Sequence, residues 1–206
     1  MLVGCLLTTQ QKSGRQGNVH KFIHTKPFPL AYKTCLSKRN VERYSRKTLS
    51  DFGGIRFTNK IPSQIARNLT HLEEEGLWTD ILAKLKTLLK ETTRDLEREV
   101  ADYIDDDKRY HGFGPKQSRN FLQWLGLTRY EIPIDSKVVK WLKEFGVLGA
   151  LSADALSDKD YYHFVSDGIQ ELCRASNIYP CALDAAIFFN GDGKKTGYKM
   201  MSSLEL

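Results

Sequence analysis

Apolar residues recur at helical spacing along most of the chain. After Pro62 they fall at Ile65, Leu69 and Leu72, on one face of a helix, until Gly76 interrupts the pattern. A second run with the same spacing covers residues 78–89. No segment shows the long alternation of apolar and polar residues that is typical of a half-buried β-strand. The sequence therefore predicts an all-α fold.

Two short helices are expected before Pro62. The first is apolar and ends within residues 2–11, and the second covers residues 18–24, where Pro27 then stops it. Residues 29–48 stand out by their positive charge, and residues 52–57 are expected to form a loop.

Five further helices are predicted after residue 90. Thr92 or Thr93 is a candidate N-cap for the first of them, and Gly146 is a suitable stop for the third. Their expected ranges are 93–104, 116–126, 136–145, 157–172 and 180–189. Residues 191–206 have little apolar periodicity and are expected to be a tail.

Charge is distributed unevenly along the 206 residues. The net charge is +6, but residues 1–50 contain ten Lys or Arg residues and a single acidic one, Glu42. The remainder is slightly acidic. A basic segment on a near-neutral body suits contact with a polyanion such as nucleic acid, although a solvated lysine-rich loop has the same composition.

Several classes of protein are not expected. No apolar run approaches the length of a membrane span, and the N-terminus lacks the basic start of a secretory signal. The four cysteines are scattered, as in a reduced cytoplasmic protein. His20 and His24 share a helix face but have no third ligand nearby, so we expect no metal site and no cofactor.

Lys116 follows a glycine-rich turn at the start of a predicted helix. Gly112 and Gly114 flank Phe113 and allow a tight turn that a partner can approach closely, and Pro115 suits the first helical position. N–H groups of such a turn can hold a phosphate oxygen. The positive end of the helix disfavours an ammonium there, and a lysine with a lowered pKa is a nucleophile that forms Schiff bases. Lys116 as a plain phosphate contact is the alternative.

Asp135 is the residue that favours chemistry at Lys116. It precedes the helix 136–145 and is a candidate N-cap, which by itself is a structural role. The helix after Lys116 is roughly 16 Å long, and residues 127–134 can return over that distance when extended. The carboxylate can therefore lie beside the amine, where the two groups can share proton transfers at a sugar carbon.

These motifs resemble the helix–hairpin–helix DNA glycosylase superfamily. The similarity lies in Gly112-Phe-Gly-Pro-Lys116, in the small residue Ser118, and in Pro133-Ile-Asp135 nineteen residues after the lysine. His111 stands where the family usually has proline. The lysine and aspartate together are typical of the bifunctional glycosylase/AP lyases.

The resemblance implies a two-lobed helical bundle with an active-site cleft between the lobes. One lobe would cover about residues 30–127, with the hairpin at 110–116, and the other would combine residues 1–29 with 128–190. Lys116 and Asp135 would be catalytic, with Gly112, Gly114 and Lys116 on a DNA phosphate. The partner would be double-stranded DNA with a damaged base, and the enzyme a cytoplasmic or nucleoid-associated monomer.

Other site residues follow from the same resemblance. Gln10 or Gln11 would fill the gap that an extruded nucleotide leaves in the duplex. Only Cys173 and Cys181 lie where relatives acting on oxidised pyrimidines carry a four-cysteine iron–sulfur loop, so the clusterless 8-oxoguanine branch fits better. In that branch the base pocket would be built from Asn120, Asp184, Phe188 and Phe189.

Two alternatives stay open. The hairpin can grip DNA without chemistry, as in a non-catalytic helix–hairpin–helix binding protein, and the substrate of an enzyme can be another oxidised base. The family usually has additional sequence before the apolar segment at residue 2, so an incomplete N-terminus, and with it an inactive relative, is also an expectation.

Overall fold

Helices account for every regular element in the part of the chain that the computed structural model describes. That part comprises residues 1–9, 11, 14, 16–106, 109–147 and 151–191. The predicted all-α class is confirmed. The helices are α1 (Leu2–Leu7), α2 (Asn18–Ile23), α3 (Tyr32–Leu36), α4 (Val41–Phe52), α5 (Lys60–Glu74), α6 (Leu77–Lys90), α7 (Arg94–Ile104), α8 (Pro115–Trp124), α9 (Ser136–Glu144), the short 3-10 helix η1 (Ala155–Ser157), α10 (Lys159–Ala175) and α11 (Pro180–Gly191).

Side-chain caps set the start of several helices. The Thr93 hydroxyl accepts the Leu96 N–H and opens α7, and Asp158 accepts the Tyr161 N–H and opens α10. These bonds satisfy N–H groups that lack an acceptor within the helix. The predicted cap at Thr92 or Thr93 is therefore confirmed at Thr93.

Helices α3 and α4 were not expected from the sequence. Asn40 caps α4 by accepting the Arg43 N–H, and the buried face of the helix carries Ser45 and Leu49. Only a few apolar residues mark that face, and basic residues dominate the segment, so its charge obscures a helical spacing that is nevertheless present.

The buried residues form two hydrophobic clusters. The first runs from Cys5 to Leu127 and the second from Ile132 to Ile187. Residues 1–29, expected with the second group, belong to the first, because α1 packs against α5 and α8. Gly4 permits this contact, since a Cβ there would lie 2.3 Å from Trp124 Cζ3. The packing of α1 therefore joins the start of the chain to α5 and α8, and the lobe boundaries stay a prediction.

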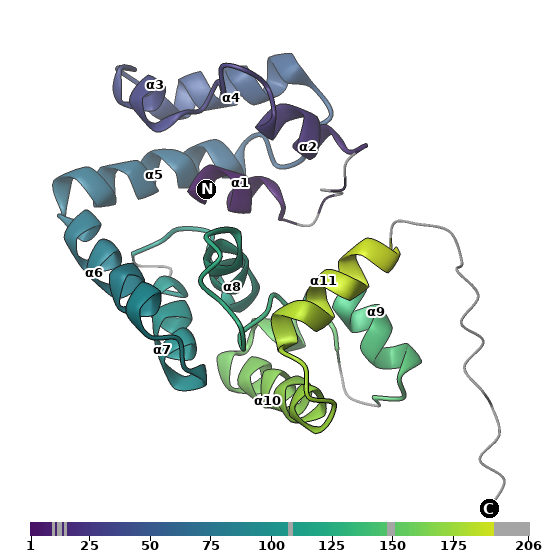
Figure 1. Ribbon diagram of the computed structural model, residues 1–206. Coiled ribbons are helices and arrows are strands. Elements are labelled where there is room, and N and C mark those ends of the chain that lie inside the picture. The colour runs from purple at the N-terminus through teal and green to yellow at the C-terminus, as the bar shows by residue number, and fades with distance from the viewer. Residues whose placement is uncertain (10, 12–13, 15, 107–108, 148–150, 192–206) are drawn as a thin grey trace, which may run out of the picture.

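Helix α8 lies near the middle of the molecule. Figure 1 shows it with α1 and α5 on one side and with α10 and α11 on the other. It contacts α1 and α7 directly, while α11 packs against α9 and α10. The start of α8 is therefore surrounded by segments that are distant in sequence. None of the helices described is long and apolar enough to cross a membrane.

Candidate active site at the start of helix α8

The turn before α8 is held in place by side chains of α5. Asn68, itself buried, accepts the His111 N–H at 2.6 Å and donates to the His111 carbonyl at 3.0 Å. Gly112 has φ +83°, and a Cβ there would lie 2.4 Å from Gln64 Nε2, so this position requires glycine. Phe113 is buried and anchors the turn from within.

Gly114 plays a different part from Gly112. It is the N-cap residue of α8, with φ −110°, and a Cβ there would have no neighbour within 4 Å. Pro115 occupies the first position of the helix, as predicted. The open space at Gly114 leaves room for a partner to approach the backbone.

Lys116 is half-buried at the first turn of α8. Burial lowers the pKa of its amine below the ordinary value, whereas electrostatic interactions with Asp135, Cys5 and Asp184 act in the opposite direction and only partly offset it. These four residues come from α8, the start of α9, α1 and α11. A lysine with a lowered pKa holds a larger fraction of neutral, nucleophilic amine near neutral pH.

Asp135 caps α9, as its position before the helix predicts. One oxygen, Oδ1, accepts the N–H groups of Lys137 at 2.8 Å and Val138 at 3.1 Å. Those bonds leave Oδ2 unused by the cap. The structural role and a role near Lys116 are therefore compatible in one side chain.

Asp184, on α11, is the second carboxylate whose charge acts on Lys116. Its Oδ2 accepts a hydrogen bond from Gln123 Nε2 of α8 at 2.7 Å. Burial raises the pKa of the Asp184 carboxyl, and the Asp135 charge acts in the same direction, against the Gln123 hydrogen bond and the Lys116 and Lys137 charges. Lys116, Asp135 and Asp184 therefore lie near enough for the charges of the two carboxyl groups to act on the amine.

Phe188 and Phe189 follow on the same helix. The Lys137 ammonium lies 4.0 Å from the centre of the Phe188 ring and also donates to the Phe188 carbonyl at 3.2 Å. Phe188 is 37% exposed and Phe189 is 67% exposed. Phe188 lies one turn after Asp184 and is held from α9, so it is the better placed of the two aromatic candidates.

Asn120 and Gln11 have other contacts. The Asn120 amide donates to Thr8 Oγ1 and to Gln117 Oε1, each at 3.2 Å, and so ties α8 to the end of α1. Gln11 Nε2 donates to the Leu7 carbonyl, and its Oε1 accepts the Arg56 N–H at 2.9 Å. The structure does not place either side chain with the two carboxyl groups. Gln10 lies outside the described residues.

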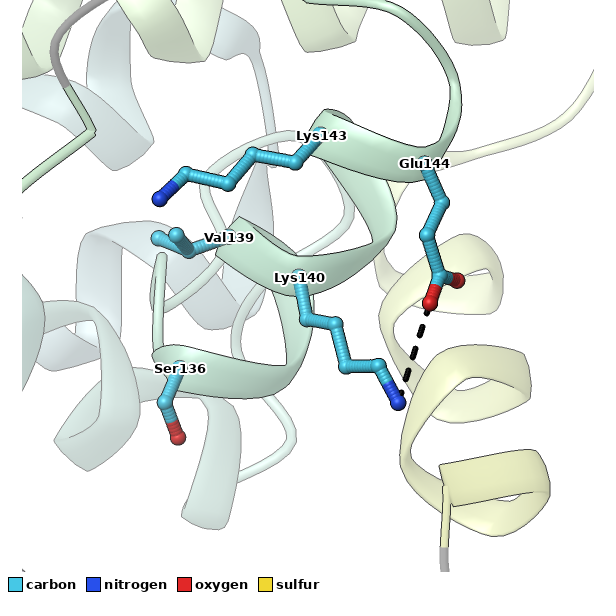
Figure 2. A pocket seen from close by; sticks show the side chains of 5 residues that line it. All are labelled: Ser136, Val139, Lys140, Lys143 and Glu144. Carbon is cyan, nitrogen blue, oxygen red and sulfur yellow. Dashed lines mark ion pairs between the residues drawn. The ribbon is translucent and has the colours of Figure 1, made fainter.

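Two hollows are found in the surface, and Lys116 does not line either of them. One, of about 440 Å³, runs along α9 (Figure 2), where Lys143 and Val139 point to one side of the helix, Ser136 lies at its start, and Lys140 pairs with Glu144 at 3.7 Å. The other, of about 340 Å³, is lined by Met1, Thr8, Val19, His20, Ile23, His24 and Trp124. Within the described residues, no group of three or more His, Cys, Asp or Glu side chains is arranged to hold a metal ion.

Sequence reasoning missed three residues of this group. Gln123 follows Lys116 by two helical turns, so its spacing indicates a shared face. Lys137 lies two residues after Asp135, where a cation beside an aromatic side chain has no sequence signature. Cys5 comes near Lys116 only through the packing of α1 on α8, and burial raises the pKa of its thiol to about 12.

No family model, curated protein or solved structure matches this chain.

Proposed function

We propose that this chain is a DNA glycosylase with AP lyase activity that removes an oxidised purine, 8-oxoguanine, from duplex DNA through a lysine Schiff base. The observation that carries the proposal is the half-buried Lys116 amine, whose pKa is lowered by burial while the Asp135 carboxylate lies near enough for its charge to act on it. An amine in this state suits attack on an electrophilic carbon.

The glycosylase step begins with an extruded nucleotide in a cleft next to α8. The neutral Lys116 amine attacks the sugar C1′. The bond from C1′ to the base nitrogen breaks, and its electron pair leaves with the base, which takes up a proton. The Asp135 carboxylate faces the positive charge that develops on the sugar and stabilises it. The amine then loses a proton, the C1′–O4′ bond breaks as O4′ takes up a proton, and a protonated imine joins Lys116 to C1′.

The lyase step uses the protonated imine as an electron sink. Removal of a proton from C2′ sends the C–H electron pair into the imine and gives an enamine. The enamine electrons then form a C2′=C3′ double bond, the C3′–O bond breaks, and the 3′ phosphate leaves with the electron pair of that bond. Asp184 or Asp135 is close enough to Lys116 to influence these proton transfers through its charge.

The neighbouring residues supply binding. Phe188 stacks on the extruded base and Asp184 contacts its polar edge, while the turn at Gly114 holds a phosphate. Lys143, which extends from α9 on the side opposite the Lys140–Glu144 pair, provides a further backbone contact (Figure 2). Each of these contacts is part of the proposal.

Borohydride trapping tests the enzyme directly. We expect a covalent adduct between the parent protein and a duplex containing 8-oxoguanine, and no adduct with Lys116→Ala. Lys86→Ala, the same change at an exposed lysine of α6, is the matched control and should trap like the parent. A panel of other oxidised bases identifies the preferred lesion.

The second candidate is a DNA-binding module without chemistry. The clamp of Asn68 on the turn and the open space at Gly114 favour phosphate binding whether or not Lys116 reacts. This candidate predicts salt-dependent binding to any duplex, with no adduct on any lesion.

A further inference from the structure

A buried ion pair links the helix of Lys116 to the connection that leads to Asp135. Arg119, one turn after Lys116, donates from Nε to Glu131 Oε2 at 2.9 Å, and both side chains are fully buried. Glu131 lies four residues before Asp135. The pair therefore spans the two segments whose relative placement decides whether amine and carboxylate meet.

Glu131 is bound from three helices. Besides Arg119 of α8, its Oε1 accepts hydrogen bonds from Arg98 Nε of α7 at 3.0 Å and from Gln170 Nε2 of α10 at 3.0 Å. A buried carboxylate without such partners would be strongly destabilising, so these bonds fix its position closely.

Hydrogen bonds also fix the position of the Arg119 guanidinium. Its Nη2 donates to Asp102 Oδ1 of α7 at 2.8 Å, and its Nη1 reaches the Pro115 carbonyl, next to Lys116, at 3.4 Å. The guanidinium is a rigid planar fork, so these bonds set its direction as well as its distance.

A second buried carboxylate fixes the path of the connection. Glu97 of α7 accepts the backbone N–H groups of Arg129 at 2.7 Å and of Tyr130 and Glu131, each at 2.8 Å. Residues 127–134 are long enough, at roughly 3.3 Å each, to follow several routes back along α8. Glu97 and Glu131 together select one route.

We propose that Arg119 and Glu131 are positioning residues, whose buried pair places the Asp135 carboxylate beside the Lys116 amine. The role rests on the proposed function for its chemical consequence. A well-packed apolar pair would support stability as effectively, but it would not impose the direction that a forked ion pair gives.

The test uses two variants and one control. Arg119→Met keeps an unbranched stem and removes the fork, and Glu131→Gln keeps the shape and removes the charge. Arg94→Met is the control, because Arg94 pairs with Asp167 at 3.0 Å in a partly exposed position and does not contact Glu131 or Arg119. The readouts are the single-turnover trapping rate at saturating 8-oxoguanine DNA, the DNA dissociation constant, and the pKa of Lys116 from an NMR titration of ¹⁵N-labelled lysine.

We expect Arg119→Met and Glu131→Gln to slow trapping by about 10- to 100-fold while changing DNA affinity by less than about threefold. The Lys116 pKa should fall below that of the parent, because the raising effect of Asp135 weakens whereas burial persists and Cys5 and Asp184 keep their positions. A loss of stability alone would not move this pKa in the folded fraction. Arg94→Met should match the parent in all three readouts.

Folded variants with the parent's trapping rate and the parent's Lys116 pKa would overturn the positioning role. If circular dichroism shows that Arg119→Met does not fold, Glu131→Gln decides, together with Arg119→Lys, which keeps the charge without the fork. A parent protein that traps nothing overturns the proposed function instead, and the NMR titration still decides whether the pair places Asp135 near Lys116.

Discussion

Two opposing effects act on the Lys116 amine, and burial is the larger. It disfavours the ammonium form more than the electrostatic interactions with Asp135, Cys5 and Asp184 favour it, so the pKa is lowered. The carboxylates are nevertheless close enough to act on the same atom. That combination separates Lys116 from a phosphate-contacting lysine on an open surface, whose amine stays fully charged.

Asp135→Asn tests the charge apart from the cap. Asparagine is as good an N-cap as aspartate, so stability should change by less than about 0.5 kcal/mol, whereas the trapping rate should fall by about 10²- to 10⁴-fold. Because the Asp135 charge raises the Lys116 pKa, its removal should shift the acid limb of the rate–pH profile to lower pH. Chemical unfolding and trapping across pH measure the two effects. An unchanged rate would exclude Asp135 from the chemistry.

Phe188→Ala and Phe189→Ala form a matched pair on α11. Stacking of a base on an aromatic ring contributes about 1–3 kcal/mol, so loss of the ring that Lys137 holds should reduce lesion binding by about 5- to 100-fold. Phe189 is more exposed and should matter less. Fluorescence anisotropy with 8-oxoguanine DNA distinguishes them, and equal losses would contradict the assignment of Phe188.

At the scale of the element, two glycines in the turn before α8 have different roles. Gly112 determines the shape of the turn, and Gly114 is open to contact with a partner. Gly112→Ala should destabilise the protein by about 1–2 kcal/mol, because φ +83° is unfavourable for alanine and its Cβ meets Gln64. Gly114→Ala should cost less than about 1 kcal/mol, since its φ is ordinary and its Cβ enters open space.

The same pair of variants tests the phosphate contact. A methyl group at Gly114 should keep a phosphate from the backbone and weaken DNA binding by about tenfold or more in a folded protein. Urea unfolding and a binding titration give the two quantities. A Gly114→Ala protein that binds DNA like the parent would show that the turn does not hold phosphate there.

Local signals explain which elements were predicted from the sequence. Thr93 and Asp135 cap their helices as expected, because a cap depends on residues within one turn. The same holds for the turn at Gly112 and Pro115. Helix α4 was missed because its buried face is narrow and its exposed face is strongly charged. The spacing of apolar residues also predicted helix α8, but it did not indicate that Gln123 would donate a hydrogen bond to Asp184.

At the scale of the molecule, long-range packing determines what the sequence did not reveal. Lys116 and Asp135 were predicted to approach because the intervening length allows it, and Asp184 was a candidate through resemblance. The buried Arg119–Glu131 pair and the Glu97 contacts join segments that no local pattern relates. The contact of Gly4 with Trp124 likewise joins segments that are far apart along the chain, so the sequence alone did not indicate it.

The raised pKa of Asp105, at the end of α7, predicts that the stability of the protein depends on pH. Burial raises the pKa of its carboxyl to about 6, from an ordinary value of 3.8, despite the opposing charges of Arg119 and Lys159. The folded state then holds more protons than the unfolded state between about pH 4 and pH 6, so this carboxyl lowers stability as pH rises through that window.

Asp105→Asn should therefore raise the free energy of unfolding at pH 7.5 by about 1–2 kcal/mol, after allowance for partial exposure, with little effect at pH 4. Asp95→Asn, at an exposed position in the first turn of the same helix, is the control and should give no increase. Urea unfolding at both pH values measures the difference. Equal effects of Asp105→Asn at the two pH values would contradict the raised pKa.

Peptide mapping of the borohydride-reduced complex tests most directly whether the Lys116 amine reacts with a damaged nucleotide. Protease and nuclease digestion followed by mass spectrometry should place the sugar remnant on Lys116. A remnant on another amine, or a parent protein that forms no adduct with any lesion duplex, would contradict this assignment.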